Sequence, residues 1–194
     1  MESPKTLITI LFIATTAIAS AQPIVERREG NVRAQGNLAG GYLFSQKAFS
    51  AYLAGDMDLF IDDNVSLTGE AWYGFKTHDK PTGLLRNHAV YWGFNYHPLK
   101  KGRWDPYVGL SPGMALVQAG YHDGEGIARK TFGAAPLASG VIGCNYYVGS
   151  VFHFFVKARA VAGRFRGSSP EFTNLNEMKL SAGLGWNARL WKKK

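Results

Sequence analysis

Hydrophobic and polar residues alternate along most of the chain after residue 30, with a period of two that predicts β-strands rather than helices. Between residues 51 and 62, Leu53 and Met57 fall on one face, while Asp56 and Asp58 fall on the other. The tight-turn sequence Asp-Asp-Asn follows, and the alternation then resumes. This segment therefore predicts a hairpin with one apolar and one polar face.

The same alternation recurs along the chain and predicts eight strands. They are expected at 31–44, 51–62, 65–76, 88–97, 106–117, 136–146, 151–163 and 178–191. Each is long enough for the roughly 9–11 residues that a tilted membrane strand requires. The pattern predicts an all-β protein, an eight-stranded antiparallel up-and-down transmembrane β-barrel.

The predicted connections alternate in length. Short ones are expected at 62–64, 98–105 and 148–150, and longer ones at 77–87, 118–135 and 164–177, with a brief first loop at 45–50. Short turns on the periplasmic side and long loops outside are typical of bacterial outer-membrane barrels. An even number of strands then brings both termini to the periplasmic side.

Alternation alone also fits a soluble periplasmic barrel of the lipocalin type, with its apolar face inward around a small hydrophobic ligand. Three features favour the inverted, membrane-embedded arrangement: the loop asymmetry, the small residues on the polar face, and aromatic residues near the strand ends. The aromatic residues expected at the lipid interface are Tyr42, Phe44, Tyr73, Phe75, Tyr96, Tyr146, Trp186 and Trp191.

The first residues have the organisation of a secretory signal peptide. Lys5 precedes an apolar stretch at 7–19, and Ala19-Ser20-Ala21 forms a small-x-small cleavage site. A membrane anchor is disfavoured because the apolar stretch is shorter than the ~20 residues needed to span a bilayer. We expect a cleaved signal peptide at 1–21 and a barrel domain at 22–194. No long apolar run follows, which excludes helical spans and leaves a barrel as the membrane form.

Charge and cysteine content narrow the possible partners. The formal net charge is +8 and the pI is about 9.6, but export and the lack of a nucleic-acid-reading motif argue against nucleic acid. Anionic lipid head groups or acidic polysaccharide are the more plausible partners of a basic exported protein. Cys144 is the only cysteine, so disulfides do not stabilise the fold, and it is expected to be a packed small residue.

Two segments carry a resemblance to a known group. The segment 105–114, Asp-Pro-Tyr-Val-Gly-Leu-Ser-Pro-Gly-Met, resembles a Pro-Tyr-Val-Gly strand opening, and 181–186, Ser-Ala-Gly-Leu-Gly-Trp, resembles a glycine-and-aromatic closing strand. The chain thus looks like the small outer-membrane β-barrel superfamily, the OmpA-, OmpX- and OmpW-like porin family. Such chains usually end on an aromatic residue, whereas here Lys192–Lys194 follow Trp191.

That resemblance implies an outer-membrane location in a Gram-negative cell envelope. It implies contact with outer-membrane lipid, including lipopolysaccharide, and with the barrel-assembly machinery during biogenesis. It does not fix a function, because members include adhesins and small-solute pores. We expect a monomer without a cofactor.

Candidate catalytic and metal-binding residues are few. Lipid A deacylases of this architecture have a His-x-Ser motif on one strand. None of the five histidines here is followed by serine two residues later. His122, Asp123 and Glu125 could hold a hard cation, but a solvated loop is the favoured interpretation. No nucleophile, base and orienting group can be recognised in the sequence, so we expect no enzyme activity and no metal site.

Charged residues on the inferred lumen face are the main candidate site. They are Arg33, Asp56, Asp58, Glu70, Lys157, Arg159, Lys179 and Arg189. Opposite charges across a narrow barrel would form a salt-bridged plug or, as the less favoured alternative, a gate. A second group, Lys80, Arg86, Arg129, Lys130, Arg164 and Arg166, is expected near the outer leaflet, either in contact with lipid phosphates or simply solvated. The expected role is structural, surface-binding or limited small-solute passage.

Overall fold

A computed structural model describes residues 28–75, 83–168 and 172–190. It contains nine strands: β1 (Asn31–Leu43), β2 (Ala48–Phe60), β3 (Val65–Gly74), β4 (Gly83–Tyr96), β5 (Trp104–His122), β6 (Ala128–Tyr147), β7 (Phe152–Phe165), β8 (Thr173–Asn174) and β9 (Glu177–Arg189). No described helix is long and apolar enough to cross a membrane. The signal peptide predicted at 1–21 lies outside the described residues.

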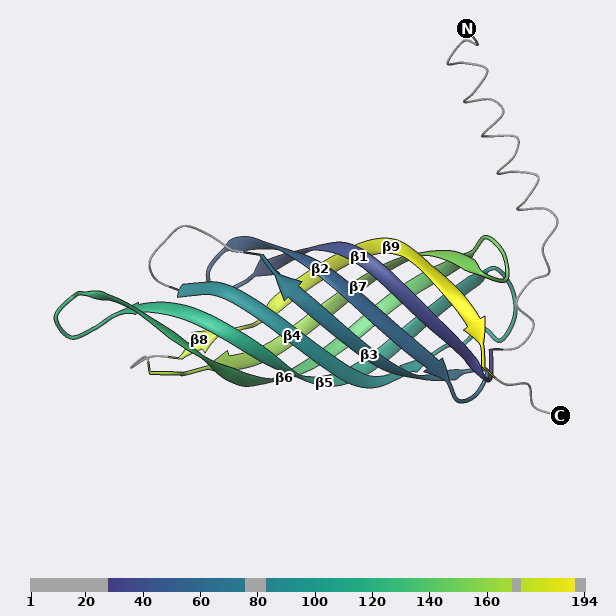
Figure 1. The fold of residues 1–194 in the computed structure, drawn as a ribbon, viewed down its shortest axis with the longest axis horizontal. Helices are drawn as coiled ribbons and strands as arrows, with labels where there is room; N and C mark the ends of the chain where they lie inside the picture. Colours follow the sequence, from purple (N-terminus) through teal and green to yellow (C-terminus); the bar gives the residue numbers. More distant parts are fainter. Residues whose placement is uncertain (1–27, 76–82, 169–171, 191–194) are drawn as a thin grey trace, which may run out of the picture.

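Eight of these strands close into a barrel, which confirms the predicted fold class (Figure 1). Each strand from β1 to β7 pairs antiparallel with the next, and β9 pairs with both β7 and β1. The seam between β1 and β9 runs in unbroken register from Asn31, opposite Arg189, to Leu43, opposite Glu177. The two-residue β8 only extends the sheet beside the end of β7.

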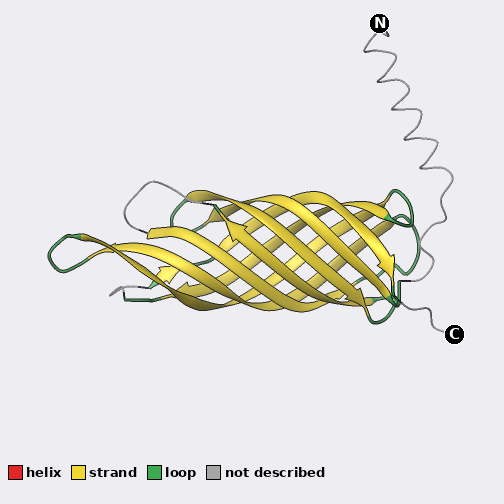
Figure 2. Ribbon diagram, viewed as in Figure 1, coloured by secondary structure: helices red, strands yellow, loops and turns green. Residues whose placement is uncertain are grey.

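The two ends of the barrel differ (Figure 2). We call the end with the short connections at 61–64, 97–103 and 148–151 the turn end; both ends of the described chain also lie there. The opposite end, the loop end, carries the hairpin between β5 and β6, which projects beyond the other strands. The predicted asymmetry of the connections is therefore present, although one predicted loop is built differently.

The segment 118–135, predicted as a loop, is mostly strand. β5 continues to His122, β6 begins at Ala128, and the two stay paired from Trp104 opposite Tyr146 to the very tip. Its small and charged residues suggested a loop, but the two arms satisfy each other's backbone hydrogen bonds outside the barrel wall. Strand β4 likewise begins at Gly83, within the predicted loop 77–87, whose residues up to 82 are not described.

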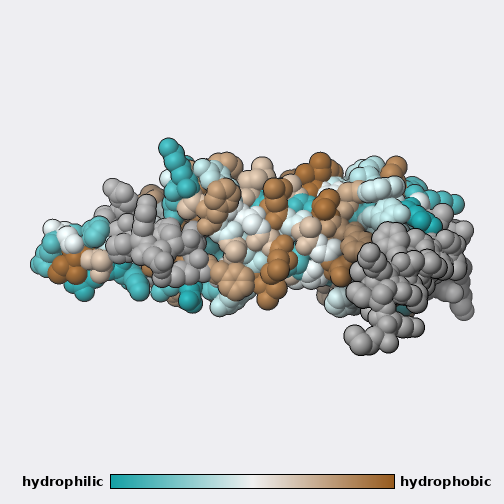
Figure 3. Space-filling model, turned by 90° about the horizontal axis from the view of Figure 1, so that it is seen from above, coloured by the Kyte–Doolittle hydropathy of each residue, from teal (hydrophilic) through white to brown (hydrophobic). Residues whose placement is uncertain are grey.

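Charged and polar side chains fill much of the barrel interior, whereas large apolar side chains cover its outer face. Leu38 and Leu110 on the outer face are 71% and 76% exposed, whereas Arg33 and Arg159 inside are 0% and 1% exposed. Figure 3 shows hydrophobic residues gathered around the middle of one face, with hydrophilic residues toward both ends. A soluble barrel would have the opposite arrangement, so the lipocalin-like alternative is wrong.

Candidate functional site

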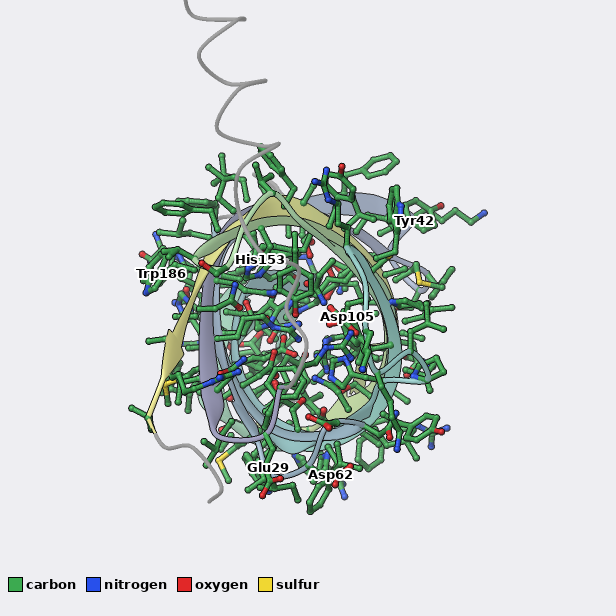
Figure 4. All side chains as sticks on the ribbon, turned by 90° about the vertical axis from the view of Figure 1, so that its right-hand side faces the viewer. Glu29, Tyr42, Asp62, Asp105, His153 and Trp186 are labelled. Atoms are coloured by element: carbon green, nitrogen blue, oxygen red, sulfur yellow. The ribbon has the colours of Figure 1, made fainter. Side chains whose placement is uncertain are left out.

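The lumen at the turn end holds a buried charge cluster centred on Asp105. Its carboxylate lies 3.0 Å from Nη1 of Arg28, 2.9 Å from Nη1 of Arg33 and 2.8 Å from Nδ1 of His97. Arg33 also donates to Asp58 through Nε at 2.9 Å and Nη2 at 2.6 Å. Figure 4, which looks in from the turn end, shows Asp105 among side chains that fill the interior.

Aromatic rings and amides complete this turn-end cluster. The guanidinium of Arg33 lies 5.1 Å from the ring centre of Phe60 and 5.6 Å from that of Tyr107. Asn145 donates to Asp105 at 3.1 Å and accepts from Gln35 at 3.0 Å. The cation–π contacts and the ion pairs with Asp58 and Asp105 offset part of the desolvation of Arg33.

A second group, the middle cluster, joins strands on opposite sides of the barrel. Lys157 on β7 donates to Asp56 on β2 at 2.8 Å and to Glu70 on β3 at 3.3 Å. Arg159 on β7 pairs with Glu70 and donates to Ser139 on β6. The bridges connect β7 to strands distant from it in the barrel wall, so they cross the lumen rather than run along the wall.

Lys179 occupies an aromatic cage just beyond the middle cluster. Its Nζ lies 4.0 Å from the ring centre of Tyr52, 4.7 Å from that of Trp72 and 5.7 Å from that of Tyr91. Glu177 lies 3.6 Å from the same Nζ and accepts a hydrogen bond from Tyr52 at 2.7 Å. The cage brings one buried cation against three aromatic faces, an arrangement that stabilises a desolvated charge.

Toward the loop end the lumen becomes apolar. A buried cluster continues from the aromatic cage to a layer of aliphatic and aromatic side chains. That layer includes Leu43, Leu84, Val117, Phe165 and Leu175, each at most 3% exposed. Ions moving along the axis would meet a charged section and then a dry apolar one.

The structure places most of the predicted lumen residues inside the barrel. Seven side chains are buried there: Arg33, Asp56, Asp58, Glu70, Lys157, Arg159 and Lys179. Arg189 shares their inward register, opposite the buried Asn31, but it lies outside the buried cluster. It is the last residue of β9, is exposed at the turn-end rim, and donates from Nε to Asn31 at 3.0 Å.

Three buried charges were missed by the sequence analysis: Arg28, Asp105 and Glu177. Arg28 precedes the first predicted strand, 31–44, whereas the other two lie just before the predicted strands 106–117 and 178–191. Asp105 shares the inward register of Tyr107, and Glu177 shares that of Lys179. Extending the alternation by one residue at the start of each of these predicted strands would have found both acidic residues.

Aromatic side chains lie on the outer face near both ends of the barrel. Of the predicted interface residues, Tyr42, Phe44, Tyr73 and Phe75 lie near the loop end, while Tyr96, Tyr146 and Trp186 lie near the turn end. Figure 4 shows Tyr42 and Trp186 pointing away from the barrel. Trp191 lies outside the described residues. Phe49, Trp104 and Phe152, at 77%, 61% and 62% exposure, occupy equivalent positions that the sequence analysis did not list.

Comparisons of sequence find no matching family model and no matching curated protein. Comparison of structures does find similar folds. Neisserial surface protein A aligns with a TM-score of 0.58 and 16% identity, covering 80% of this chain and 95% of that one. The outer membrane protein OprG from Pseudomonas aeruginosa aligns with a TM-score of 0.56 and 10% identity, covering 86% and 100%. The chain has the fold of the small eight-stranded outer-membrane β-barrels.

A further structure with this barrel fold has a bound ligand. Ail, the attachment invasion locus protein of Yersinia pestis, in complex with the heparin analogue sucrose octasulfate, aligns with a TM-score of 0.50 and 11% identity, covering 82% of this chain and 99% of that one. These structural alignments show the fold that was expected from the resemblance. Together with the apolar outer face, the fold is that of a membrane barrel.

The turn-end cluster of this membrane barrel also contains a serine, a histidine and an aspartate that form a chain of two hydrogen bonds. Oγ of Ser66 lies 3.1 Å from Nε2 of His97, whose Nδ1 lies 2.8 Å from Asp105. The sequence analysis recognised no such set. All three side chains have no exposed surface, and the carboxylate also pairs with Arg28 and Arg33. The arrangement therefore fixes the His97 ring within the cluster and offers no open face to a substrate.

The acidic residues proposed as possible cation ligands form the hairpin tip. Asp123 accepts from the backbone N–H groups of Glu125 at 3.1 Å and Ile127 at 2.8 Å, and from Nε of Arg129 at 2.9 Å. These contacts, with the Arg129 hydrogen bond foremost, lower the pKa of Asp123. Its carboxylate thus closes the turn.

Among the described residues, no three His, Cys, Asp or Glu side chains are grouped as a metal site. Cys144 is half-buried and forms no disulfide.

Proposed function

We propose that this protein is an integral outer-membrane barrel with a closed lumen, which binds polyanionic saccharide at its loop-end surface. The observation that carries the proposal is the filled lumen: Arg33, Arg159 and Lys179 are each at most 1% exposed and lie against carboxylates and aromatic rings. A barrel that is filled along its axis acts through its surface.

The outer-membrane location is supported by three independent features. The outer face is apolar and flanked by aromatic residues, as lipid-embedded barrels require. The residue pattern at 1–21 predicts an export signal, and such a signal would direct passage across the inner membrane. Structures of the same fold include the outer membrane protein OprG from Pseudomonas aeruginosa and Neisserial surface protein A.

Small-solute passage is the less favoured role. Opening a path along the axis would separate Lys157 from Asp56 and Glu70, and Arg159 from Glu70. Leaving a buried charge without its partner costs about 3–5 kcal/mol. The apolar layer beyond Lys179 would also have to admit water, which adds a second barrier to ion movement.

Surface binding is supported by the shape and charge of the loop end. The β5–β6 hairpin projects from the barrel (Figure 1). Arg129 and Lys130 on this hairpin are exposed. Exposed basic residues at this end are Lys47, Arg86, Arg129, Lys130, Arg164 and Arg166, against the acidic residues Asp123 and Glu125 among those described. The binding of a heparin analogue by Ail, a barrel of the same fold, makes sulfated or phosphorylated saccharide the ligand class to test.

The experiment measures binding of sucrose octasulfate to the purified, folded barrel by isothermal titration calorimetry. We expect Arg129→Glu/Lys130→Glu to abolish binding and added salt to weaken it. Lys100→Glu/Lys101→Glu, at the turn end, is the matched control, because it makes the same charge change on two exposed lysines. Equal loss in both variants would reduce the effect to net charge and overturn the assignment to the hairpin.

Planar-bilayer recording separates this proposal from passage. We expect the wild-type barrel to insert without conductance steps. Regular single-channel steps that change in Glu70→Ala would instead support passage through the lumen, because Glu70 lies on the lumen axis and not on the surface.

A further inference from the structure

A β-bulge in β4 turns Arg86 to the outer face of the barrel. The pairing of β4 with β5 shifts between Leu84 and Arg86, so Leu85 has no partner and Arg86 lies opposite Gln118. Leu84 and Leu85 are both buried, whereas Arg86 is exposed. Without the extra residue, Leu85 would face outward opposite Gln118 and Arg86 would face the lumen. Bulges commonly re-aim a side chain in this way next to functional sites.

The register places Arg86 on the outer face beside one polar and one aromatic neighbour. Arg86 pairs with Gln118, which pairs with Phe132 on β6, and the next row toward the turn end pairs His88 with Leu116. These five residues line a cleft of about 160 Å³. Arg86 lies within ion-pair distance of no carboxylate among the described residues, so its charge is available to a ligand.

His88 adds a hydrogen-bond donor to the cleft. Its Nδ1 accepts from the backbone N–H of Gly74 at 3.2 Å, so the neutral ring carries its proton on Nε2. The ring packs against Tyr73 with 4.6 Å between ring centres, which holds its orientation. Nε2 makes no hydrogen bond to any of the described residues, so the cleft offers a guanidinium, an imidazole N–H and the Gln118 amide together.

An apolar groove continues from this cleft toward the middle of the barrel. It has a volume of about 660 Å³ and shares His88 and Leu116 with the cleft. Gly55 and Ala71 lie directly opposite each other and form its low floor. Larger side chains form its walls: Leu53, Tyr73, Val90, Met114 and Leu116. The groups that could bind an anion therefore lie directly above an apolar groove that suits an acyl chain.

We infer that this cleft and groove bind one molecule of lipopolysaccharide, with a lipid A phosphate at Arg86 and His88 and an acyl chain in the groove. The inference rests on the proposed outer-membrane location, which turns the loop end toward the outer leaflet. Lipid A has phosphate directly above acyl chains, the same order as the side chains here. Charge-assisted hydrogen bonds from arginine suit a phosphate.

A second groove on the outer face differs from the first cleft and groove because no outward-facing cationic residue is among the described residues that line it. It is larger, about 910 Å³, and is lined by Leu38, Val108, Ile142, Val156 and Leu180 among others. Its one charged lining residue, Lys157, points into the lumen and pairs with Asp56. This groove matches bulk lipid chains but carries no group for a headgroup, so charge complementarity selects the groove below Arg86.

The test uses native mass spectrometry of the folded barrel with added diphosphoryl lipid A. We expect one bound molecule, at least tenfold weaker binding in Arg86→Glu, and binding close to wild type in Arg86→Lys. Lys100→Glu makes the same charge change at an exposed position of the turn end and is the matched control. Heat-modifiability on a gel shows that each variant is folded.

Three results would overturn the inference: no binding by the wild-type barrel, equal weakening in Arg86→Glu and Lys100→Glu, or equal affinity for phosphatidylglycerol. The saccharide test depends on Arg129 and Lys130 rather than on Arg86, and membrane fractionation tests the location directly. A failure of this lipid site is therefore distinguishable from a failure of the proposed function.

Discussion

Replacing Glu70 removes the one carboxylate that holds both cations of the middle cluster. Arg159 pairs with Glu70, Lys157 lies 3.3 Å from it, and Trp72 donates its indole N–H to it at 2.9 Å. In Glu70→Ala, Lys157 keeps Asp56 at 2.8 Å, but Arg159 loses its carboxylate while remaining buried. The change therefore strands one buried charge rather than two.

Stranding one buried charge should lower the free energy of unfolding by about 3–5 kcal/mol. Glu70→Gln keeps an acceptor for Trp72 and fills the same volume, so its loss should be smaller. The exposed pair of Asp123 and Arg129, in which Arg129 is 57% exposed, supplies the control. Asp123→Ala should cost at most about 1 kcal/mol, because exposed ion pairs contribute little.

The assay is urea unfolding of the barrel reconstituted in lipid vesicles, followed by tryptophan fluorescence. We expect the wild type to unfold at the highest urea concentration. The midpoint should then fall in the order Asp123→Ala, Glu70→Gln and Glu70→Ala. If Glu70→Ala unfolds at the same urea concentration as Asp123→Ala, the cross-lumen bridges do not hold the barrel together and the plug interpretation fails.

Two further predictions concern the hairpin tip and the buried serine. Because its folded pKa is lowered, Asp123 stabilises the tip above the ordinary aspartate pKa of about 3.9, and this contribution is lost as pH falls through the lowered value. An amide-shift titration of Ile127 should report that loss, and Asp123→Ala should abolish the transition. A fluorophosphonate probe should leave Ser66 unlabelled in the folded barrel, because Ser66 and His97 have no exposed surface; rapid labelling that vanishes in Ser66→Ala would instead indicate a catalytic serine.

The alternation of side chains was enough to predict the strands and the direction of most lumen charges. A period of two is enforced by the pleat, so Asp58 and Lys157 could be assigned to the inner face before any pairing was known. Strand ends were less predictable, because the residues of the β5–β6 hairpin carry no strong strand preference. Their pairing depends on the two arms meeting beyond the barrel wall.

The partners within the lumen could not be predicted, because register and closure decide them. Ser66, His97 and Asp105 come from three segments whose spacing in the sequence has no signature, and the turn end brings them together. The direction of the Arg86 side chain could not be predicted for a different reason. Its outward direction depends on a single extra residue, Leu85, and simple alternation cannot place such a bulge.

The seam between β1 and β9 joins residues near the two ends of the described chain. Until β9 is in place, β1 and β7 each present an unpaired edge, and such edges are costly in lipid and prone to pair with other chains in water. Closure also requires contacts of very high sequence separation, which makes folding slow. The barrel should therefore assemble late and cooperatively, and loss of β9 alone should yield an aggregation-prone open sheet rather than a smaller pore.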